Sequence, residues 1–399
     1  MKITAENRFK YNENSVNIVK DKIIDIKDKI SFTSDRKAEN EIKKWTVMLY
    51  SAGDNNLRRY LYDDINELET VGSDKNTNII TLMDQGSSNC RIYDLEKDSD
   101  LSRINSPVLK EMGNTDMANP LVLADFIRFS MKNYPAENYA LIISDHGGGW
   151  EGAVEDDSYN NWMTMEKLKK GLEIAKSQTG NKIDVLGFDA CLMANTEAVY
   201  QLKDQAKFIV ASEQNIGADG WPYAKIFSRE ALVSLQRRLN NKLDMSPRDF
   251  SKKIVTSSNG FNATNTMSAL EMNNMENLAL SLKNFSSKVI ENKISADTLK
   301  KLVYDTEGFS SLNDLGDFLS RFIADNTIKN DEMKDLARNA LEEMRNVIIA
   351  EQHSSIYPGA NGLTIQLESE NSEKYNNLDF VKRSGWDNFV RYIYKQKNC

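Results

Sequence analysis

His146 and Cys191 are the two residues of this sequence whose side chains and neighbours best suit thiol chemistry. His146 follows an apolar run in residues 139–145, and Cys191 ends a second run in residues 183–191. A thiol is a weak nucleophile until a base, usually an imidazole, removes its proton. Apolar runs of this length are typical of buried parallel strands, which present reactive residues at their carboxyl ends. We therefore predict a Cys/His dyad at the ends of neighbouring parallel strands.

The residues around His146 favour a catalytic histidine over a structural one. Three glycines, Gly147 to Gly149, follow it, and a loop without side chains lets a peptide approach a general base. Asp145 precedes it, but successive strand residues point to opposite faces, so this aspartate is not expected to orient the imidazole. A packed or surface histidine and a small buried cysteine are the simpler alternatives. His353 is interpreted as a surface residue.

The rest of the pattern predicts an α/β fold with a mostly parallel central sheet flanked by helices. Besides the two runs above, strands are expected at 45–52, 78–84, 91–95 and 207–212, and helices at 57–71, 119–133, 162–178 and 193–203. Beyond about residue 222 the pattern turns mainly helical, with amphipathic stretches at 265–291, 296–306, 312–326 and 331–351. A last strand at 362–367 and a helix at 380–395 follow.

Several motifs occur in order along most of the chain. They are WTVMLYSAGDNNL (45–57), LIISDHGGGW (141–150), IDVLGFDACLMANTEAVYQL (183–202), ASEQNIGADGWPY (211–223) and YPGANGLTIQL (357–367). With them the sequence resembles the clostripain family of cysteine endopeptidases, in the caspase/gingipain/legumain group. HGGGW and DACLMA together are specific, whereas either alone would be weak. The resemblance implies a caspase-like fold with a largely helical C-terminal part.

The resemblance also implies a role for each site residue. Cys191 would attack the scissile carbonyl, His146 would act as acid and base, and the N–H groups of Gly147 and Cys191 would hold the oxyanion. Asp189 and Asp219 would form the pocket for the residue before the scissile bond, which in this family is arginine or, in some members, lysine. A buried carboxylate selects a basic side chain through charge-assisted hydrogen bonds. A strand-end aspartate and an ordinary Asp-Gly turn are the structural alternatives.

The expected organisation has three parts. Residues 1–44 form an N-terminal arm, or a pro-segment with basic pairs at 36–37 and 43–44; residues 45–225 form the caspase-like core; residues 226–399 form a mainly helical part that returns a strand and a helix to the core. Some relatives cut themselves at a basic residue in the loop after the histidine strand. No Lys or Arg lies between His146 and Lys167, so self-activation at that loop is not expected.

Composition narrows the class of protein and its partners. The 399 residues are 40% hydrophobic and 28% charged with a net charge of −8, which is typical of a globular chain and argues against nucleic acid as the partner. No apolar run is long enough to span a membrane. The expected partners are protein or peptide substrates with basic residues, and a monomer is favoured. The compartment is left open: secreted if this chain lacks a leader, otherwise cytoplasmic.

The remaining expectations concern cofactors and alternative functions. Thiol chemistry needs no cofactor, but some relatives require calcium, and residues 155–157 are three consecutive acids. Their spacing is not that of an EF-hand, so a solvated acidic loop is preferred. Two other functions remain open beside hydrolysis. A caspase-like transpeptidase or ligase would pass the acyl group to an amine, and an idle scaffold would only bind proteins.

Overall fold

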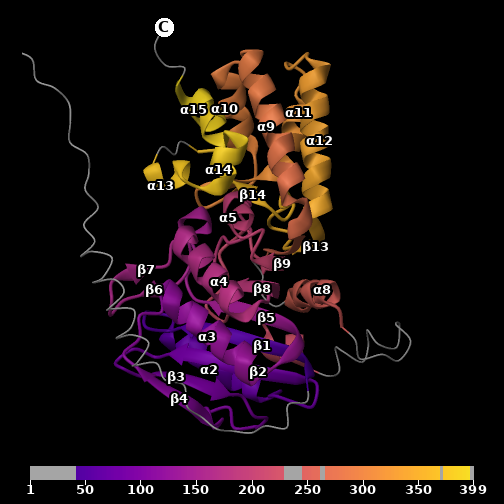
Figure 1. The fold of residues 1–399 in the computed structure, drawn as a ribbon. Helices are drawn as coiled ribbons and strands as arrows, with labels where there is room; N and C mark the ends of the chain where they lie inside the picture. Colours follow the sequence, from indigo (N-terminus) through magenta and orange to yellow (C-terminus); the bar gives the residue numbers. More distant parts are fainter. Residues whose placement is uncertain (1–41, 229–244, 261–265, 369–371, 396–399) are drawn as a thin grey trace, which may run out of the picture. The chain divides into compact units, whose positions relative to one another are not determined.

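A nine-stranded mixed sheet forms the centre of the computed structural model, which describes residues 42–228, 245–260, 266–368 and 372–395 (Figure 1). The strand order is β13-β10-β9-β8-β5-β1-β2-β3-β4. The five parallel strands are β1 (Lys43–Ala52), β2 (Thr77–Asp84), β5 (Ala136–Ser144), β8 (Ile183–Asp189) and β9 (Ala206–Ala211). Antiparallel strands extend both edges: β3 (Cys90–Asp94) and β4 (Val108–Gly113) at one, β10 (Thr266–Glu271) and β13 (Ile348–His353) at the other.

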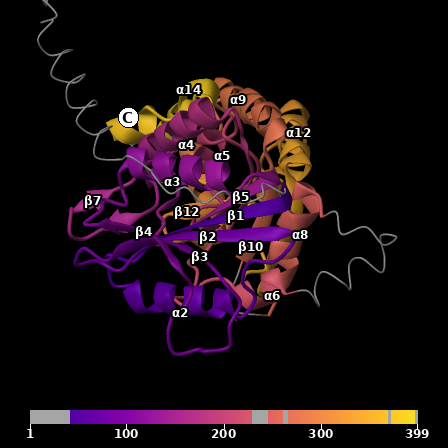
Figure 2. The same ribbon diagram turned by 60° about the horizontal axis from the view of Figure 1, so that its bottom comes forward.

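Helices cover both faces of this sheet, as Figure 2 shows. One face carries α3 (Pro120–Asn133), α4 (Met165–Thr179) and α5 (Thr196–Gln201), and the other carries α2 (Arg58–Glu69), α6 (Tyr223–Phe227) and α8 (Pro247–Ser258). Every residue of β8 is buried, and so are the last six residues of β5. Strands buried on both faces carry nearly continuous apolar runs, which explains why the sequence pattern identifies them.

The C-terminal part adds a group of helices and three very short strands. The helices are α9 (Met275–Glu291), α10 (Ala296–Asp305), α11 (Leu315–Ala324), α12 (Asp331–Val347), α13 (Glu373–Asn376), α14 (Asp379–Ser384) and α15 (Trp386–Lys395). The short strands β11 (Gly308–Phe309), β12 (Leu312–Asp314) and β14 (Thr364–Ile365) form a separate sheet. A hairpin of β6 (Glu155–Asp156) and β7 (Asn161–Trp162) and two 3₁₀ turns (Gly149–Glu151, Met272–Asn274) complete the described elements. None of the helices among the described residues has the length and apolar character needed to span a bilayer.

The predicted α/β fold class is confirmed, but the elements of the C-terminal part differ in detail. The stretch predicted as helix from residue 265 begins with β10, because residues 268–271 pair with β9 at the edge of the sheet. Residues 348–353, expected near the end of a helix, form β13 beside β10. The strand expected at 362–367 shortens to β14, which pairs with β12 rather than with the main sheet. Pairing with distant strands has overridden local helical periodicity here.

The N-terminal expectations fall mostly outside the described residues. Residues 1–41, and with them the basic pair at 36–37, lie in a part of the chain that is not described. The second pair, Lys43 and Lys44, lies in β1, where the Lys43 N–H donates to the Pro135 carbonyl. A protease needs an unpaired backbone, so cleavage after this second pair would first require β1 to detach from the sheet.

Candidate active site

The register of two neighbouring strands brings His146 and Cys191 to the same edge of the sheet. Ser144 at the end of β5 is paired with Asp189 at the end of β8, and the Asp145 N–H donates to the Asp189 carbonyl at 3.2 Å. His146 and Cys191 each follow two residues after this pair. Gly147 lies against the cysteine backbone: a Cβ on it would be 2.9 Å from the Cys191 nitrogen and 2.2 Å from its oxygen. Any side chain at position 147 would therefore displace this strand end.

The thiol of Cys191 is half-buried and protonated in the resting structure. Its Sγ lies 3.8 Å from the Ile216 carbonyl, to which it donates. Burial raises the pKa of this thiol, and the nearby Asp189 carboxylate raises it further. Leu192, the next residue, has a positive φ of 65°, a conformation that costs energy for a residue with a side chain. The thiol thus needs a base, and it sits on a strained turn.

Asn56 holds the imidazole of His146, a contact that the sequence analysis did not anticipate. His146 Nε2 lies 2.7 Å from Asn56 Oδ1, and the Glu155 carboxylate is 3.8 Å away. Because an amide oxygen only accepts, Nε2 carries the proton in this contact and Nδ1 is left to take one from a thiol. The Asp-Asn-Asn sequence before α2 was predicted to cap that helix. Instead, Asn55 Oδ1 accepts from the Leu57 N–H, and Asn56 turns to the histidine.

Asp145 faces away from the imidazole, as strand alternation predicts. Its carboxylate accepts from Asn55 Nδ2 at 2.7 Å and from the Glu155 N–H at 2.6 Å. Burial raises its pKa well above the ordinary value. This aspartate ties together the loops on either side of the histidine, so its contribution is to hold the loops in place.

Asp189 lies buried beneath the cysteine with only part of its hydrogen-bonding capacity used. Its Oδ2 accepts from the Trp221 N–H at 3.0 Å, the Tyr223 hydroxyl at 2.8 Å and the Ser144 hydroxyl at 3.5 Å. Its Oδ1 is buried, and no described residue donates to it. Burial raises the pKa of Asp189 to about 6. Asp219 differs: it is exposed, in a turn closed by the Gly220 N–H and the Gly217 carbonyl.

A second buried carboxylate, Asp64 on α2, lies beside Asp189 and was missed by the sequence analysis. Asp64 is 6% exposed, and its Oδ2 has no donor among the described residues. The signal was present in the sequence. Asp64 falls between Leu61, Ile65 and Leu68 at helical spacing, so it occupies the apolar face of α2. A charged residue on such a face calls for an explanation.

Comparison with known proteins identifies the family. The family model described as the clostripain family, peptidase family C11, matches residues 49–393. The chain belongs to the clostripain family of cysteine proteases. It is 29% identical to clostripain from Hathewaya histolytica over 230 residues, which are 48% of this chain and 43% of that protein. The chain thus matches less than half the length of this curated relative.

Solved C11 structures show the same fold. A secreted C11 cysteine protease from Bacteroides thetaiotaomicron, in complex with an irreversible peptide inhibitor, has a TM-score of 0.64 at 22% identity and covers 86% of this chain and 100% of its own. An inactive zymogen C11 protease from Parabacteroides distasonis has a TM-score of 0.63 at 21% identity and covers 87% and 99%. The expected caspase-like fold, a mostly parallel sheet flanked by helices, is confirmed.

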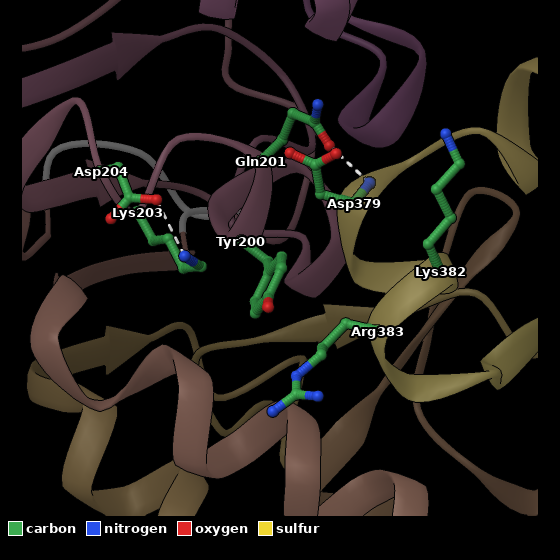
Figure 3. A pocket seen from close by; sticks show the side chains of 7 residues that line it. All are labelled: Tyr200, Gln201, Lys203, Asp204, Asp379, Lys382 and Arg383. Atoms are coloured by element: carbon green, nitrogen blue, oxygen red, sulfur yellow. Dashed lines mark hydrogen bonds and ion pairs between the residues drawn. The ribbon is translucent and has the colours of Figure 1, made fainter.

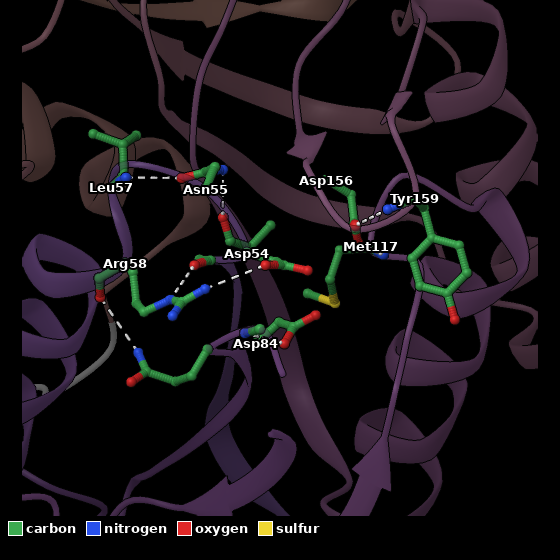
Figure 4. Close-up of polar contacts among 12 residues, drawn as sticks. Asp54, Asn55, Leu57, Arg58, Asp84, Met117, Asp156 and Tyr159 are labelled. Carbon is green, nitrogen blue, oxygen red and sulfur yellow. Dashed lines mark hydrogen bonds and ion pairs between the residues drawn. The ribbon is translucent and has the colours of Figure 1, made fainter. Parts of the chain in front are cut away.

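Three aspartates behind the histidine loop of this clostripain-family chain form a candidate cation site (Figure 4). Asp54, Asp84 and Asp156 are buried, and a carboxylate oxygen from each lies within 4.8 Å of the others. Burial raises the pKa of Asp84 to about 6 and also raises that of Asp156. Arg58 contacts Asp54 at 3.3 Å. Carboxylate oxygens are the ligands that calcium prefers, so this donor set fits such an ion.

The interpretation of residues 155–157 as a solvated acidic loop is wrong for Asp156. Its two oxygens accept from the N–H groups of Met117 and Tyr159, and the residue is fully buried. Of the three acids only Asp157 is exposed, and Glu155 is half-buried. The loop folds back as a short hairpin, which the sequence pattern did not reveal because each of its strands has two residues.

A surface cavity of about 390 Å³ lies apart from His146 and Cys191, beside the ends of α5 and α14 (Figure 3). Its lining is strongly charged, but the charges are largely matched: Lys203 pairs with Asp204 at 2.8 Å, and Arg383 pairs with Glu276. The lining residues are Tyr200, Gln201, Lys203, Asp204, Asp379, Lys382 and Arg383. This cavity contains none of the residues predicted for catalysis or substrate binding.

Proposed function

We propose that this chain is a cysteine endopeptidase that hydrolyses peptide bonds on the carboxyl side of arginine, and of lysine at a lower rate. The single observation that carries the proposal is the pairing of β5 with β8, which sets His146 beside Cys191 directly above the buried carboxylate of Asp189. Nucleophile, base and a selector for a positive charge then belong to one strand edge.

The proposed reaction begins with transfer of the Cys191 proton to His146 Nδ1. The sulfur attacks the scissile carbonyl carbon, and the oxyanion is held by the N–H groups of Gly147 and Cys191. Such a donor is worth about 3 kcal/mol of transition-state stabilisation. The protonated His146 then gives its proton to the leaving amine, which forms a thioester. Water activated by the same imidazole hydrolyses the thioester and restores the thiol.

Specificity in this proposal comes from carboxylates below and beside the thiol. Asp189, two residues before Cys191, would accept hydrogen bonds from the basic side chain of the substrate at its unused Oδ1. Asp219, exposed on the turn at 217–220, would act at the rim of the pocket, where solvent weakens its attraction. The partners are therefore protein or peptide substrates with basic residues.

Matched fluorogenic peptides ending in Arg, Lys, Asp or Leu test the proposal directly. The wild-type chain should release the fluorophore fastest after Arg, and an arginyl electrophile should add its mass to Cys191. Cleavage after Asp or Leu at equal rates would contradict the pocket. Absence of labelling would favour an idle scaffold, and a product carrying an added amine would indicate a transpeptidase.

Removing the amide of Asn56 is expected to slow the reaction without weakening substrate binding. The Asn56→Ala variant loses the contact that fixes the imidazole, so kcat should fall about 10- to 100-fold, by analogy with other residues that orient a catalytic base. KM should stay within about twofold of the wild type because Asn56 does not contact the pocket. Asn56→Asp keeps an oxygen acceptor and should recover most of kcat. An unchanged kcat in the alanine variant would remove this role.

The proposed chemistry requires no cofactor, and a chelator experiment examines the calcium alternative. If calcium were needed, Asp54, Asp84 and Asp156 would hold it and thereby fix the loop that carries His146. We expect dialysis against a chelator to leave the kcat for the Arg peptide unchanged. Loss of activity that calcium alone restores, and that Asp84→Asn also produces, would support the calcium alternative.

A further inference from the structure

We propose that Asp64 is the second buried carboxylate of the substrate pocket, and that Asp64 and Asp189 together make this pocket prefer arginine to lysine. The inference rests on the proposed function, because it concerns the same pocket. It assigns the main partner role of Asp189 to a residue on α2, which lies far from the cysteine in sequence, rather than to the exposed Asp219.

Gly220 shows how close the two carboxylates lie. A Cβ at this glycine would be 2.8 Å from Asp189 Oδ2 and 2.9 Å from Asp64 Oδ2. Both residues are more than nine-tenths buried, and each keeps one oxygen without a donor: Asp64 Oδ2 and Asp189 Oδ1. Gly220 also has a positive φ of 59°. The loop therefore passes over the acid pair with no side chain between.

No positive charge within the described residues pairs with this acid pair. The titratable groups around Asp64 are Asp63 and Glu67 on α2, Asp189 on β8 and Asp219 on the loop. Tyr223 and Ser144 donate to Asp189 and complete the surroundings. Buried carboxylates are normally paired or hydrogen-bonded, because leaving them unpaired costs several kcal/mol. Two unpaired buried acids at one place indicate that the missing cation is supplied by the substrate.

The empty pocket reduces this cost by keeping a proton. Burial, followed by the charge of Asp189, raises the pKa of Asp64 to about 10. Asp64 is therefore neutral near pH 7 when the pocket is empty, and the pair carries a single proton between its two carboxyls. A guanidinium between the two carboxyls would favour the charged form of both, so arginine binding would release this proton to solvent.

The shape of guanidinium explains the predicted preference for arginine. Its five N–H donors lie in one plane and can reach two carboxylates at once. A lysine ammonium has three donors on one nitrogen and is more strongly hydrated, so it gains less from a buried site with two acceptors. A pocket with Asp189 alone would separate the two basic residues less.

The test compares Asp64→Asn with Asp63→Asn, the matched exposed neighbour on α2. We expect kcat/KM for the Arg peptide to fall about 10- to 100-fold in Asp64→Asn, with a smaller loss for the Lys peptide, because one charge-assisted contact is removed. Asp63, whose side chain is 63% exposed, should change neither value more than twofold. The rate of Cys191 alkylation by iodoacetamide should be the same in all three. An unchanged Arg/Lys ratio in Asp64→Asn overturns the inference.

A binding measurement separates this inference from the proposed reaction. In the Cys191→Ala background, N-acetyl-arginine amide should bind at least about tenfold more tightly when Asp64 is present than in the Asp64→Asn double variant. Calorimetry measures this without turnover. Equal affinities overturn the role of Asp64 whether or not the chain cleaves peptides, whereas a clear difference without any peptidase activity contradicts only the proposed reaction.

A pH profile provides a readout with Asp64 intact, in case the asparagine variant does not fold. Because Asp64 must lose its proton to meet the guanidinium, the association constant of N-acetyl-arginine amide should rise with pH between about 6 and 9. The slope should approach tenfold per pH unit at most. Where it folds, the Asp64→Asn double variant should show a flatter profile. A flat profile in the Cys191→Ala protein overturns the proposal.

Discussion

Replacing Cys191 by alanine is expected to abolish peptide hydrolysis, with kcat/KM falling at least about 10⁴-fold. The sulfur is the only atom of the proposed site that forms a covalent bond with the substrate, and nothing else at the ends of β5 and β8 replaces it. The fold should be preserved, because the thiol is half-buried and makes one long contact to the Ile216 carbonyl. Release of fluorophore from the Arg peptide measures the loss, and circular dichroism checks the fold.

Cys90 supplies the matched control for this variant. It is the other described cysteine, fully buried in β3, and burial raises the pKa of its thiol far above the ordinary value. A buried, protonated thiol is chemically inert, so Cys90→Ala should keep full activity. If the Cys191→Ala protein still turned over, or if an arginyl electrophile labelled Cys90, the assignment of the nucleophile would be wrong.

The sequence pattern predicts the central strands well because they are buried on both sides. The apolar runs before His146 and Cys191 become β5 and β8, and their neighbours β1, β2 and β9 lie where the alternation of strand and helix puts them. The pattern fails where a short segment gains its structure only from a distant partner. β10 and β13 lie in or at the end of amphipathic stretches, and the hairpin at residues 155–162 has strands of two residues each.

The candidate site divides in the same way. His146 and Cys191 stand at strand ends, so motif and register both point to them, and their roles remain proposals. Asn56 and Asp64 could not be assigned roles from the sequence, because each acts through a contact made only after α2 packs on the sheet. Asp64 nevertheless left a trace, a charge on an apolar helix face. Such a residue is worth examining in any chain whose substrate is charged.

The same acid pair should destabilise the folded protein at neutral pH. The pKa values of Asp189 and Asp64 are raised to about 6 and about 10 in the folded chain. An acid with a raised folded pKa binds its proton more tightly than the unfolded chain does, so stability is highest below the unfolded pKa near 4. It falls as pH rises toward the folded pKa. Bound arginine should restore part of this loss.

Exchange of Asp189 for asparagine is the second change expected to have a large effect. The amide keeps an oxygen that accepts from the Trp221 N–H and the Tyr223 hydroxyl, so the pocket should keep its shape. Its NH₂ would then occupy the place of Oδ1, which no described residue bonds. An acceptor facing the guanidinium becomes a donor, and one charge is lost. We expect kcat/KM for the Arg peptide to fall about 10³-fold, which matches the loss of one partner from a buried charged pair.

Asp184→Asn on the same strand is the control that gives this prediction its meaning. Asp184 is also buried, but it lies at the other end of β8, where it accepts from the Tyr139 N–H and pairs with Lys207 at 2.7 Å. That exchange should leave the Arg preference unchanged, so a similar loss in both variants would point to damage of the strand. A peptide with citrulline, the neutral analogue of arginine, completes the comparison. If Asp189 acts through charge, its exchange should bring the rates for arginine and citrulline together, and an undiminished preference for arginine would assign the selection to Asp64 and Asp219 alone.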